Sequence, residues 1–395
     1  METFELLSRN KSMFQKDIKS YENEIKNIIT QSSFLVIGGA GTIGQACVKE
    51  IFKRNPKLLH VIDINENNLV ELVRDLRSSL GYIQGDFKTF TIDSNSIQFE
   101  MLLERFSPYD YVLNLSAMKH VRNEKDPYSL MRMIEINILN AFKILNLIQE
   151  HNTKKYFCVS TDKASSPVNM MGASKRIMEH ILVYNSKNIE ISTARFANVA
   201  FSDGSLLCGV ESRLKKQQPI SAPHDIQRYF LTSEEAGELC LLSALFGENQ
   251  HIFFPNPQVK LKAFTFPDLI EKFLHLKGFK IKNCESEEEA RKSSSTLIPS
   301  GIWPCYFFKT DTGGEKSIEQ FHSDDEILLE NKFFNVGVLK IETKTKANVL
   351  NNFIKRIGKL IEDKNWNKEI LIREFERFLP EFNHHNIKKN LEDRM

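Results

Sequence analysis

Short apolar runs alternate with longer amphipathic stretches over the first half of the chain. Each run is flanked by small or polar residues, as expected for strands buried on both faces of a sheet. The runs are FLVI (34–37), LHVI (59–62), FTI (90–92), YVLNL (111–115), YFCVS (156–160) and IEISTA (189–194). Helix-competent stretches, for example QACVKEIFKR (45–54), lie between them. This alternation predicts an α/β fold with a Rossmann-type, doubly wound parallel sheet.

The pattern changes toward both ends of the chain. Helical spacing of apolar residues predicts a helical N-terminal arm over residues 1–30 and helices over 341–395. Residues 31–200 should form the dinucleotide-binding domain, with segments returning to it from the C-terminal half. Prolines punctuate shorter elements over 201–340, which predicts a smaller substrate-binding region. Within it, ESEEEARKSSS (285–295) is so polar that we expect a surface loop or lid.

Composition narrows the classes of partner. The net charge of +2 gives no reason to expect nucleic acid, and the six cysteines form no C-x-x-C pair. We therefore expect free thiols and no metal site. No stretch approaches the roughly 20 apolar residues of a membrane span, and the charged N-terminus lacks the apolar core of a signal peptide. A cytoplasmic protein is expected, and its amphipathic ends favour a homo-oligomer.

A glycine-rich turn follows the first predicted strand and opens a helix. Its residues fit both G-x-x-G-x-x-G and G-x-G-x-x-G, and glycines let the backbone approach a pyrophosphate at the helix N-terminus. The alternative is a glycine turn that binds nothing, but the strand, helix and later acidic residue together favour a dinucleotide. The predicted contacts are Gly38, Gly41, Thr42, Ile43 and Gly44.

Residues after the next strands complete the predicted cofactor site. Asp63 ends the second strand, where a carboxylate accepts hydrogen bonds from ribose hydroxyls and repels a 2′-phosphate. No arginine lies beside it, so NAD is favoured over NADP. Asp93, after the third strand, is placed to meet the adenine, and Ser116 and Ala117 follow the fourth strand. All four are predicted cofactor contacts.

Ionisable residues lie where the fifth predicted strand ends. Thr161, Asp162 and Lys163 follow that strand, and ligands of such sheets bind outside the carboxyl ends of the strands. Met171 and Lys175 come next, with Lys175 expected to open a helix beside the nicotinamide. In isolation, Asp162 and Lys163 would be an exposed ion pair. With the glycine turn and Lys175 at this spacing, they predict acid–base chemistry.

The segment STDKASSPVNMMGASKR (160–176) resembles a known family signature. It is similar to the polysaccharide-biosynthesis branch of the extended short-chain dehydrogenases, which contains UDP-N-acetylglucosamine 4,6-dehydratases and their capsule-synthesis relatives. The likeness spans about residues 5 to 320. Further matching pieces are LLSRN (6–10), LSAMKHV (115–121), Asn137, RFANV (195–199), RYF (228–230) and GEK (314–316).

The resemblance implies an NAD-dependent dehydratase of a nucleotide sugar in bacterial glycan or nonulosonic-acid synthesis. Met171 stands where these enzymes usually carry a catalytic tyrosine, which resembles the subgroup that retains the C5 configuration. Because methionine transfers no protons, we expect Asp162 to handle the C4 and C6 protons and Lys163 to take the C5 proton. Thr161 would bind the C4 oxygen. Lys163 then needs a depressed pKa, favoured by burial beside Lys175, which itself should contact the nicotinamide ribose.

The same resemblance implies a set of substrate contacts, for which the sequence leaves alternatives. They are Lys119, Met171, Asn198 and Arg228. Arg228 could equally be a structural ion-pair partner, His120 is expected to be a structural hydrogen bonder, and Trp303 to lie in the core. The family's R-x-G-E-K stretch reads DTGGEK (311–316) here, so its arginine is missing. UDP and GDP sugars both remain open.

Two other functions fit parts of this pattern. A C4 or C5 epimerase would use the same transient oxidation, although C4 epimerisation normally relies on the tyrosine that Met171 replaces. A catalytically silent NAD-binding regulator would need no ionisable pair such as Asp162 and Lys163. The dehydratase is therefore the leading hypothesis.

Overall fold

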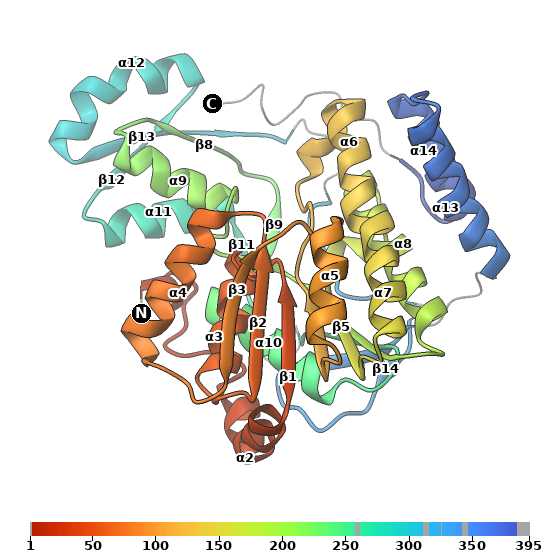
Figure 1. Ribbon diagram of the computed structural model, residues 1–395. Helices are drawn as coiled ribbons and strands as arrows, with labels where there is room; N and C mark the ends of the chain where they lie inside the picture. Colours follow the sequence, from red (N-terminus) through yellow and green to blue (C-terminus); the bar gives the residue numbers. More distant parts are fainter. Residues whose placement is uncertain (1, 257–260, 311–315, 325, 342–346, 385–395) are drawn as a thin grey trace.

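The structure is a computed structural model that describes residues 2–256, 261–310, 316–324, 326–341 and 347–384. Its largest element is a nine-stranded sheet in the order β14-β15-β10-β6-β5-β4-β1-β2-β3 (Figure 1). The strands of this sheet are β1 (Ser33–Ile37), β2 (Leu58–Asp63), β3 (Asp86–Thr91), β4 (Tyr111–Asn114), β5 (Lys155–Thr161), β6 (Glu190–Phe196), β10 (His251–Pro255), β14 (Leu328–Leu329) and β15 (Val336–Lys340).

Seven of these strands are parallel, and two antiparallel strands extend one edge. β1 pairs with both β2 and β4, so the strand order reverses between β1 and β4. β10 continues the parallel sheet beside β6, and β15 pairs with β10 in the antiparallel sense. The Rossmann-type parallel sheet predicted from the apolar runs is confirmed. The third strand begins before its run because β3 is an edge strand with alternating exposed positions.

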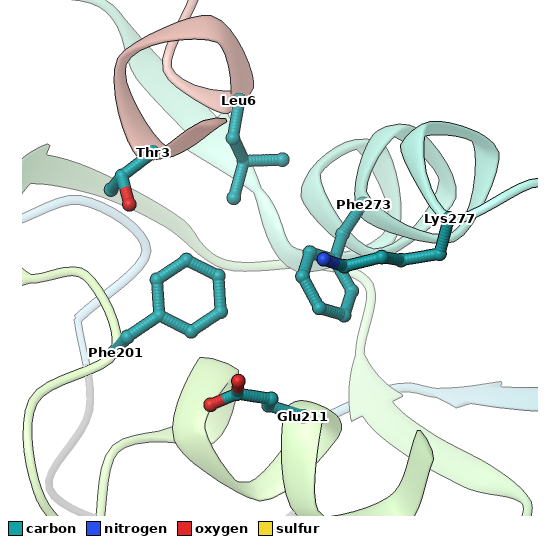
Figure 2. A pocket seen from close by; sticks show the side chains of 6 residues that line it. All are labelled: Thr3, Leu6, Phe201, Glu211, Phe273 and Lys277. Carbon is teal, nitrogen blue, oxygen red and sulfur yellow. The ribbon is translucent and has the colours of Figure 1, made fainter. Parts of the chain in front are cut away.

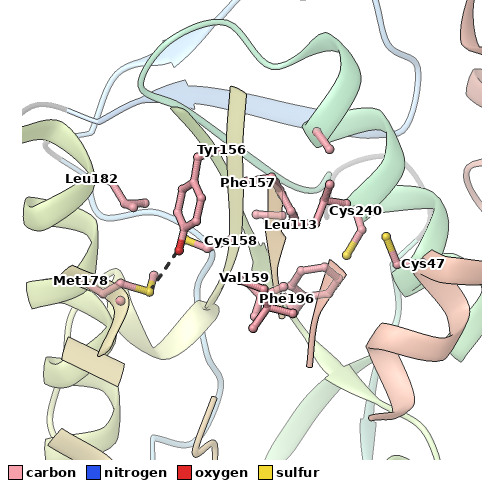
Figure 3. Close-up of a cluster of buried hydrophobic side chains, with 14 of the residues drawn as sticks. Cys47, Leu113, Tyr156, Phe157, Cys158, Val159, Met178, Leu182, Phe196 and Cys240 are labelled. Carbon is pink, nitrogen blue, oxygen red and sulfur yellow. Dashed lines mark hydrogen bonds between the residues drawn. The ribbon is translucent and has the colours of Figure 1, made fainter. Parts of the chain in front are cut away.

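Helices cover both faces of the large sheet. α3, α4 and α10 pack on one face, and α5, α7 and α8 on the other (Figure 1). The helical elements around the large sheet are α3 (Thr42–Phe52), α4 (Glu66–Leu80), α5 (Ile97–Phe106), η1 (Val121–Lys125), α6 (Pro127–Ile134), η2 (Glu135–Asn140), α7 (Ala141–Glu150), η3 (Asp162–Ala164), α8 (Met170–Asn185) and α10 (Ser233–Phe246). Figure 3 shows Cys47 of α3 and Cys240 of α10 facing each other in this core. The six cysteines are free thiols, as predicted.

A smaller region with its own core lies above the carboxyl edge of the large sheet (Figure 1). Two three-stranded sheets form it, β11-β9-β7 and β12-β13-β8. Trp303 is 1% exposed in this core, as predicted. Its elements are β7 (Asn198–Val199), α9 (Leu206–Lys215), β8 (Ile220–Pro223), β9 (Gln227–Leu231), β11 (Ala263–Thr265), α11 (Phe266–Leu276), β12 (Lys280–Cys284), α12 (Glu287–Leu297), η4 (Ile298–Ser300) and β13 (Ile302–Phe308).

The polar stretch predicted to be a loop or lid is a helix, so that prediction is wrong. Ser286 caps α12 by accepting a hydrogen bond from the backbone N–H of Glu289. Salt bridges four residues apart, such as Arg291 with Glu287, then support the exposed face. Among the described residues of α12, Ala290 is the one that is buried. The sequence therefore shows no apolar stripe from which this helix could be predicted.

The helices nearest to both ends of the described residues pack on the same molecule. The N-terminal arm is two helices, α1 (Glu2–Leu6) and α2 (Gln15–Gln31), and the C-terminal part holds α13 (Ala347–Glu362) and α14 (Lys368–Phe378). α2 contacts α10, and α14 contacts α6 and α8. The apolar faces on which the expected homo-oligomer rested are therefore buried within one chain. Among the described residues, no helix is long and apolar enough to cross a membrane.

Candidate active site

The glycine turn joins β1 to α3 and comes very close to neighbouring backbone. Gly38 has a φ of +73°, and a Cβ there would lie 2.7 Å from the backbone nitrogen of Ser116. A Cβ on Gly44 would lie 2.2 Å from the carbonyl oxygen of Gly38. A Cβ on Gly41 meets only that same oxygen, at 3.7 Å. Gly41 caps α3 without a side-chain hydrogen bond, which leaves the helix N-terminus open toward an anion.

Two of the other predicted cofactor residues, Asp63 and Ser116, lie against this turn. Asp63 accepts hydrogen bonds from the backbone N–H of Ala40 (2.9 Å) and of Asn65 (2.9 Å), so it ties β2 to the glycine turn. Ser116 lies against Gly38 across the sheet edge. Asp93 is farther out and exposed, two residues past β3. The structure thus brings Asp63 and Ser116 to the turn, whereas Asp93 is exposed beyond the end of β3.

The loop after β4 carries a basic pair toward the smaller region. Lys119 is exposed, and desolvation by the surrounding protein lowers its pKa although Asp203 opposes the effect. Burial and the charge of Lys119 lower the pKa of His120 to about 4, so the imidazole is neutral at pH 7. The Thr42 hydroxyl donates a hydrogen bond to Asp203 Oδ2 at 3.0 Å, which links the glycine turn to the smaller region.

The residues after β5 form a compact acid–base centre. The Thr161 hydroxyl donates to Asp162 Oδ1 at 2.9 Å, and the Lys163 ammonium donates to the same oxygen at 3.0 Å. Asp162 is 3% exposed and Lys163 begins to reach solvent, with 17% of its side chain exposed. One carboxylate oxygen therefore connects a hydroxyl and an ammonium group at the carboxyl edge of the sheet.

A second carboxylate, Glu319, completes this centre and was not predicted from the sequence. Its Oε1 lies 4.0 Å from Lys163 Nζ, and the residue is 3% exposed. Its Oε2 is buried and has no hydrogen-bond partner among the described residues, with Lys316 Nζ 4.0 Å away. Burial raises the pKa of Glu319, and the charge of Asp162 adds to this, against the opposing cations. We call Thr161, Asp162, Lys163 and Glu319 the acid–base cluster.

Buried polar contacts hold Glu319 in this position. The Ser165 hydroxyl lies within hydrogen-bonding distance of the carbonyls of Asp162 (2.9 Å) and Gln320 (2.8 Å). Arg195, at the end of β6 and fully buried, donates to the carbonyl of Phe321 at 2.8 Å. These contacts attach the segment 316–324 to the ends of β5 and β6.

The Arg195 guanidinium is itself held by two buried carboxylates. It pairs with Glu179 of α8 at 2.8 Å and with Glu326 at 2.6 Å. Burial opposes the charged form of Glu179, but the charge of Arg195 outweighs it and lowers the pKa of Glu179 to about 2. Arg176 joins the same two carboxylates from the rim. A network from three elements therefore fixes the geometry around the acid–base cluster.

The expected environment of Lys163 is wrong in one respect. Burial disfavours its charged form, but the carboxylates of Asp162 and Glu319 outweigh burial and raise the pKa of Lys163. Lys175 does not supply the expected neighbouring cation. Its ammonium donates a hydrogen bond to the carbonyl of Val159 in β5 at 3.0 Å. Burial lowers the pKa of Lys175 to about 8.

The first turn of α8 carries Met171 and is anchored from below. The helix begins at Met170, so Lys175 lies in its second turn and does not open it as expected. Met171 is 3% exposed. Glu124 Oε1 accepts hydrogen bonds from the backbone N–H of Met170 (2.6 Å) and Met171 (3.3 Å). His384, beyond α14, contacts the other oxygen of Glu124 at 2.9 Å, so the C-terminal part supports this turn.

Two of the predicted substrate contacts, Asn198 and Arg228, lie in strands of the smaller region. Asn198 is half-buried in β7 beside Phe230 of β9. Arg228 is 3% exposed, and its guanidinium donates to the carbonyls of Gln227 (2.8 Å) and Lys316 (2.9 Å). Of the DTGGEK stretch, residues 311–315 lie outside the described residues.

A cavity of about 250 Å³ lies apart from this site, within the smaller region. Figure 2 shows Thr3 and Leu6 of α1 facing Phe273 and Lys277 across it, with Phe201 and Glu211 closing the other sides. None of the four residues of the acid–base cluster lines this cavity. The described residues also hold no group of three or more His, Cys, Asp or Glu side chains that could bind a metal ion.

Sequence comparison finds relatives in polysaccharide biosynthesis. The family described as polysaccharide biosynthesis protein matches residues 34–295. The membrane protein MJ1061 of Methanocaldococcus jannaschii is 31% identical over 63% of this chain and 72% of that protein. The capsular polysaccharide biosynthesis protein CapD of Staphylococcus aureus is 27% identical over 84% of this chain but only 53% of CapD. The chain thus spans about half the length of CapD.

A relative with a named activity and two solved structures add to these. The inverting UDP-N-acetylglucosamine 4,6-dehydratase of Campylobacter jejuni is 25% identical over 62% of this chain and 74% of that enzyme. Pen from Bacillus thuringiensis shares the fold with a TM-score of 0.65, at 21% identity over 80% of this chain and 90% of Pen. The dTDP-glucose 4,6-dehydratase DesIV from Streptomyces venezuelae, solved with NAD, shares the fold with a TM-score of 0.56. It is 16% identical over 73% of this chain and 87% of DesIV.

Proposed function

The chain belongs to the polysaccharide biosynthesis protein family, and we propose that it is an NAD-dependent 4,6-dehydratase of a nucleotide sugar. The observation that carries this proposal is the bonding of Thr161, Asp162 and Lys163 through one carboxylate oxygen at the carboxyl edge of β5. This edge is also where the glycine turn opens α3. A cofactor crevice beside a proton-transfer centre is what a transient oxidation followed by elimination requires.

The residues around the glycine turn fit NAD. Gly38 and Gly44 leave no room for side chains, so backbone is what a pyrophosphate would meet there, at the open N-terminus of α3. Each Asp63 oxygen accepts one backbone hydrogen bond and keeps a lone pair for ribose hydroxyls. When bound, NAD supplies the acceptor and later donor of a hydride. The solved structure of DesIV, which contains NAD, supports this assignment by its shared fold.

The reaction sets a proton count that the acid–base cluster must satisfy. The C4 hydroxyl proton must leave as the C4 carbonyl forms, and the C5 proton must leave as the C6 hydroxyl departs. We assign the C4 proton to Asp162, reached through the Thr161 hydroxyl, because these two are already hydrogen-bonded at 2.9 Å. Asp162 then passes that proton to the departing C6 hydroxyl. Lys163 takes the C5 proton and returns it to the same face.

The substrate and stereochemistry are narrower parts of the proposal. UDP-N-acetylglucosamine is the proposed substrate, supported by the named activity of the Campylobacter jejuni relative. That relative is an inverting enzyme, whereas we propose retention at C5 for this chain because the buried Met171 leaves only the Thr161–Lys163 side to handle protons. The product would be the 4-keto-6-deoxy sugar of unchanged C5 configuration.

The test is incubation of the purified protein with NAD and UDP-N-acetylglucosamine, followed by mass spectrometry and NMR of the sugar. A product lighter by one water with a C4 ketone supports the proposal. The Asp162→Asn variant should lose about 10³-fold in turnover, since the C4 proton has no acceptor. An unchanged mass with a new hexose would indicate an epimerase. Cofactor binding without any product would indicate the silent regulator, and either result would refute dehydration of this substrate.

A further inference from the structure

Thr161, Asp162 and Lys163 by themselves lack one proton acceptor for the proposed reaction. Lys163 must hold a free electron pair to take the C5 proton, yet its ammonium is bonded to Asp162 at 3.0 Å and faces Glu319 at 4.0 Å. Asp162 cannot relieve Lys163 of its proton, because the C4 hydroxyl proton occupies it during the same turnover. A second carboxylate is needed within reach of Lys163, and Glu319 is the one beside it.

We propose that Glu319 is the proton acceptor of Lys163, which converts the ammonium into the free base that the C5 step needs. This inference rests on the proposed dehydratase function and deepens it. Glu319 acts through Lys163 and is therefore a positioning residue. At 4.0 Å the transfer requires a small side-chain rotation or one bridging water, since a direct hydrogen bond spans about 2.7–3.2 Å.

The surroundings of Glu319 favour its neutral form. The carboxyl is buried, and its Oε2 receives no hydrogen bond from the described residues, so nothing there stabilises the anion by direct donation. Burial raises the pKa of Glu319 most, and the Asp162 carboxylate adds to this, whereas three cations, Lys163 first and then Arg228 and Lys316, lower it. A substrate that covers the exposed part of Lys163 would remove water from the pair. Removing water disfavours two buried charges relative to two neutral groups.

The proton steps balance over one turnover. Lys163 ammonium and Glu319 carboxylate become amine and carboxylic acid. The amine takes the C5 proton, the C5–H electrons form the C5–C6 double bond, and the C6–O bond breaks as Asp162 protonates the leaving hydroxyl. After hydride returns to C6, Lys163 gives its proton to C5 and recovers one from Glu319. Every group ends in its starting state, and one water has left.

The Glu319→Gln variant tests this idea through the pH profile. The exchange between Lys163 and Glu319 releases no proton to solvent, so kcat of the wild type should be flat between about pH 7 and 9. In the variant, Lys163 must lose its proton to water. We expect kcat to fall about 100-fold at pH 7 with KM unchanged, and then to rise by close to tenfold per pH unit. Glu319→Asp should restore the flat profile with a smaller loss.

A control variant tests whether removing any buried carboxylate has the effect expected of Glu319→Gln. Glu238 of α10 is also buried with a raised pKa, but it accepts a hydrogen bond from Ser12, and no member of the acid–base cluster is among the groups that shift its pKa. Glu238→Gln should leave kcat and its pH profile unchanged. Wild-type kcat in Glu319→Gln would refute the inference, and so would a uniform loss without recovery at high pH, which indicates a structural role.

A second measurement does not depend on turnover. The rate at which a small amine-reactive reagent labels Lys163, followed by mass spectrometry against pH, reports the pKa of Lys163 directly. Because the Glu319 carboxylate raises that pKa, its midpoint should shift to lower pH in Glu319→Gln. Equal midpoints would overturn the inference. If the midpoint is lower in Glu319→Gln but the wild type makes no keto sugar, the proposed function alone is refuted.

Discussion

The glycine turn after β1 and the acid–base cluster after β5 lie at the same edge of the large sheet but are assembled differently. The turn consists of seven consecutive residues, Gly38 to Gly44, and what it offers a ligand is backbone. The cluster consists of side chains, and it joins Lys163, just past β5, to Glu319, which is 156 residues later in the chain. Binding at the first site therefore depends on local sequence, whereas proton transfer at the second depends on how the whole chain folds.

The largest effect on stability is expected at Gly44, where the glycine turn has no space for a side chain. Gly44→Ala would place a Cβ 2.2 Å from the Gly38 carbonyl oxygen, and neither backbone can move without opening the turn. We expect a loss of about 4 kcal/mol or more in the free energy of unfolding, measured by denaturant titration without cofactor. NAD binding, measured by calorimetry, should be lost as well.

Gly41→Ala is the matched control for this prediction. Its Cβ would meet only the Gly38 oxygen, at 3.7 Å, which is ordinary contact. The free energy of unfolding should change by less than about 1 kcal/mol, while the new methyl group narrows the approach to the helix N-terminus and weakens NAD binding. Equal destabilisation by both substitutions would contradict the distinction between a packing glycine and a ligand-approach glycine.

The next effect probes the long-range assembly of the acid–base cluster. Arg195→Gln would leave Glu179 and Glu326 buried without their main cation and remove the donor to Phe321. We expect a loss of about 3–5 kcal/mol in the free energy of unfolding, because a buried charge without its partner is strongly unfavourable. Turnover should also fall, since Glu319 lies two residues before Phe321.

Arg176→Gln provides the comparison within the same network. Arg176 contacts the same two carboxylates but is partly exposed, and it does not bind the 316–324 segment. Its loss should be limited to about 1 kcal/mol with near-normal turnover. If the Arg176 variant were as damaging as the Arg195 variant, the attachment of the segment would not explain the effect.

The difference between the two sites also explains what the sequence could reveal. The parallel strands and the glycine turn follow from local patterns, so their positions were predictable from apolar runs and spacing. Glu319 has no such pattern, because it becomes part of a site only when the chain returns to β5. The sole nearby signal was GEK (314–316), which ends three residues before it. The raised pKa of Lys163 was unpredictable for the same reason, since Glu319 helps to raise it.

A pH-dependent effect on stability is expected at Glu238, a buried carboxyl that is not a member of the acid–base cluster. Burial raises the pKa of Glu238 to about 8, from an ordinary value of 4.5. Between these values the unfolded chain is ionised at this residue while the folded chain stays protonated. Unfolding then releases a proton, so folding stability should fall as the pH rises from about 4.5 to 8 and level off above that.

Glu238→Gln should remove this dependence. The amide oxygen can still accept the Ser12 hydrogen bond, and no charge forms at any pH. We expect the variant to match the wild type near pH 4.5 and to exceed it by about 4 kcal/mol at pH 8 in denaturant titrations. Parallel stability curves for the two proteins would show that Glu238 is ionised in the folded state.

The smallest effect is expected at Met171, where the sequence first suggested that proton chemistry had moved. Its side chain is 3% exposed at the start of α8, and its thioether neither donates nor accepts a proton in the proposed steps. Met171→Leu preserves volume, so the free energy of unfolding should change by less than about 1.5 kcal/mol. We expect kcat to stay within about threefold of the wild type, measured beside Asp162→Asn. A loss comparable to that of Asp162→Asn would mean that the position takes part in the reaction, and that the acid–base cluster does not contain all of its chemistry.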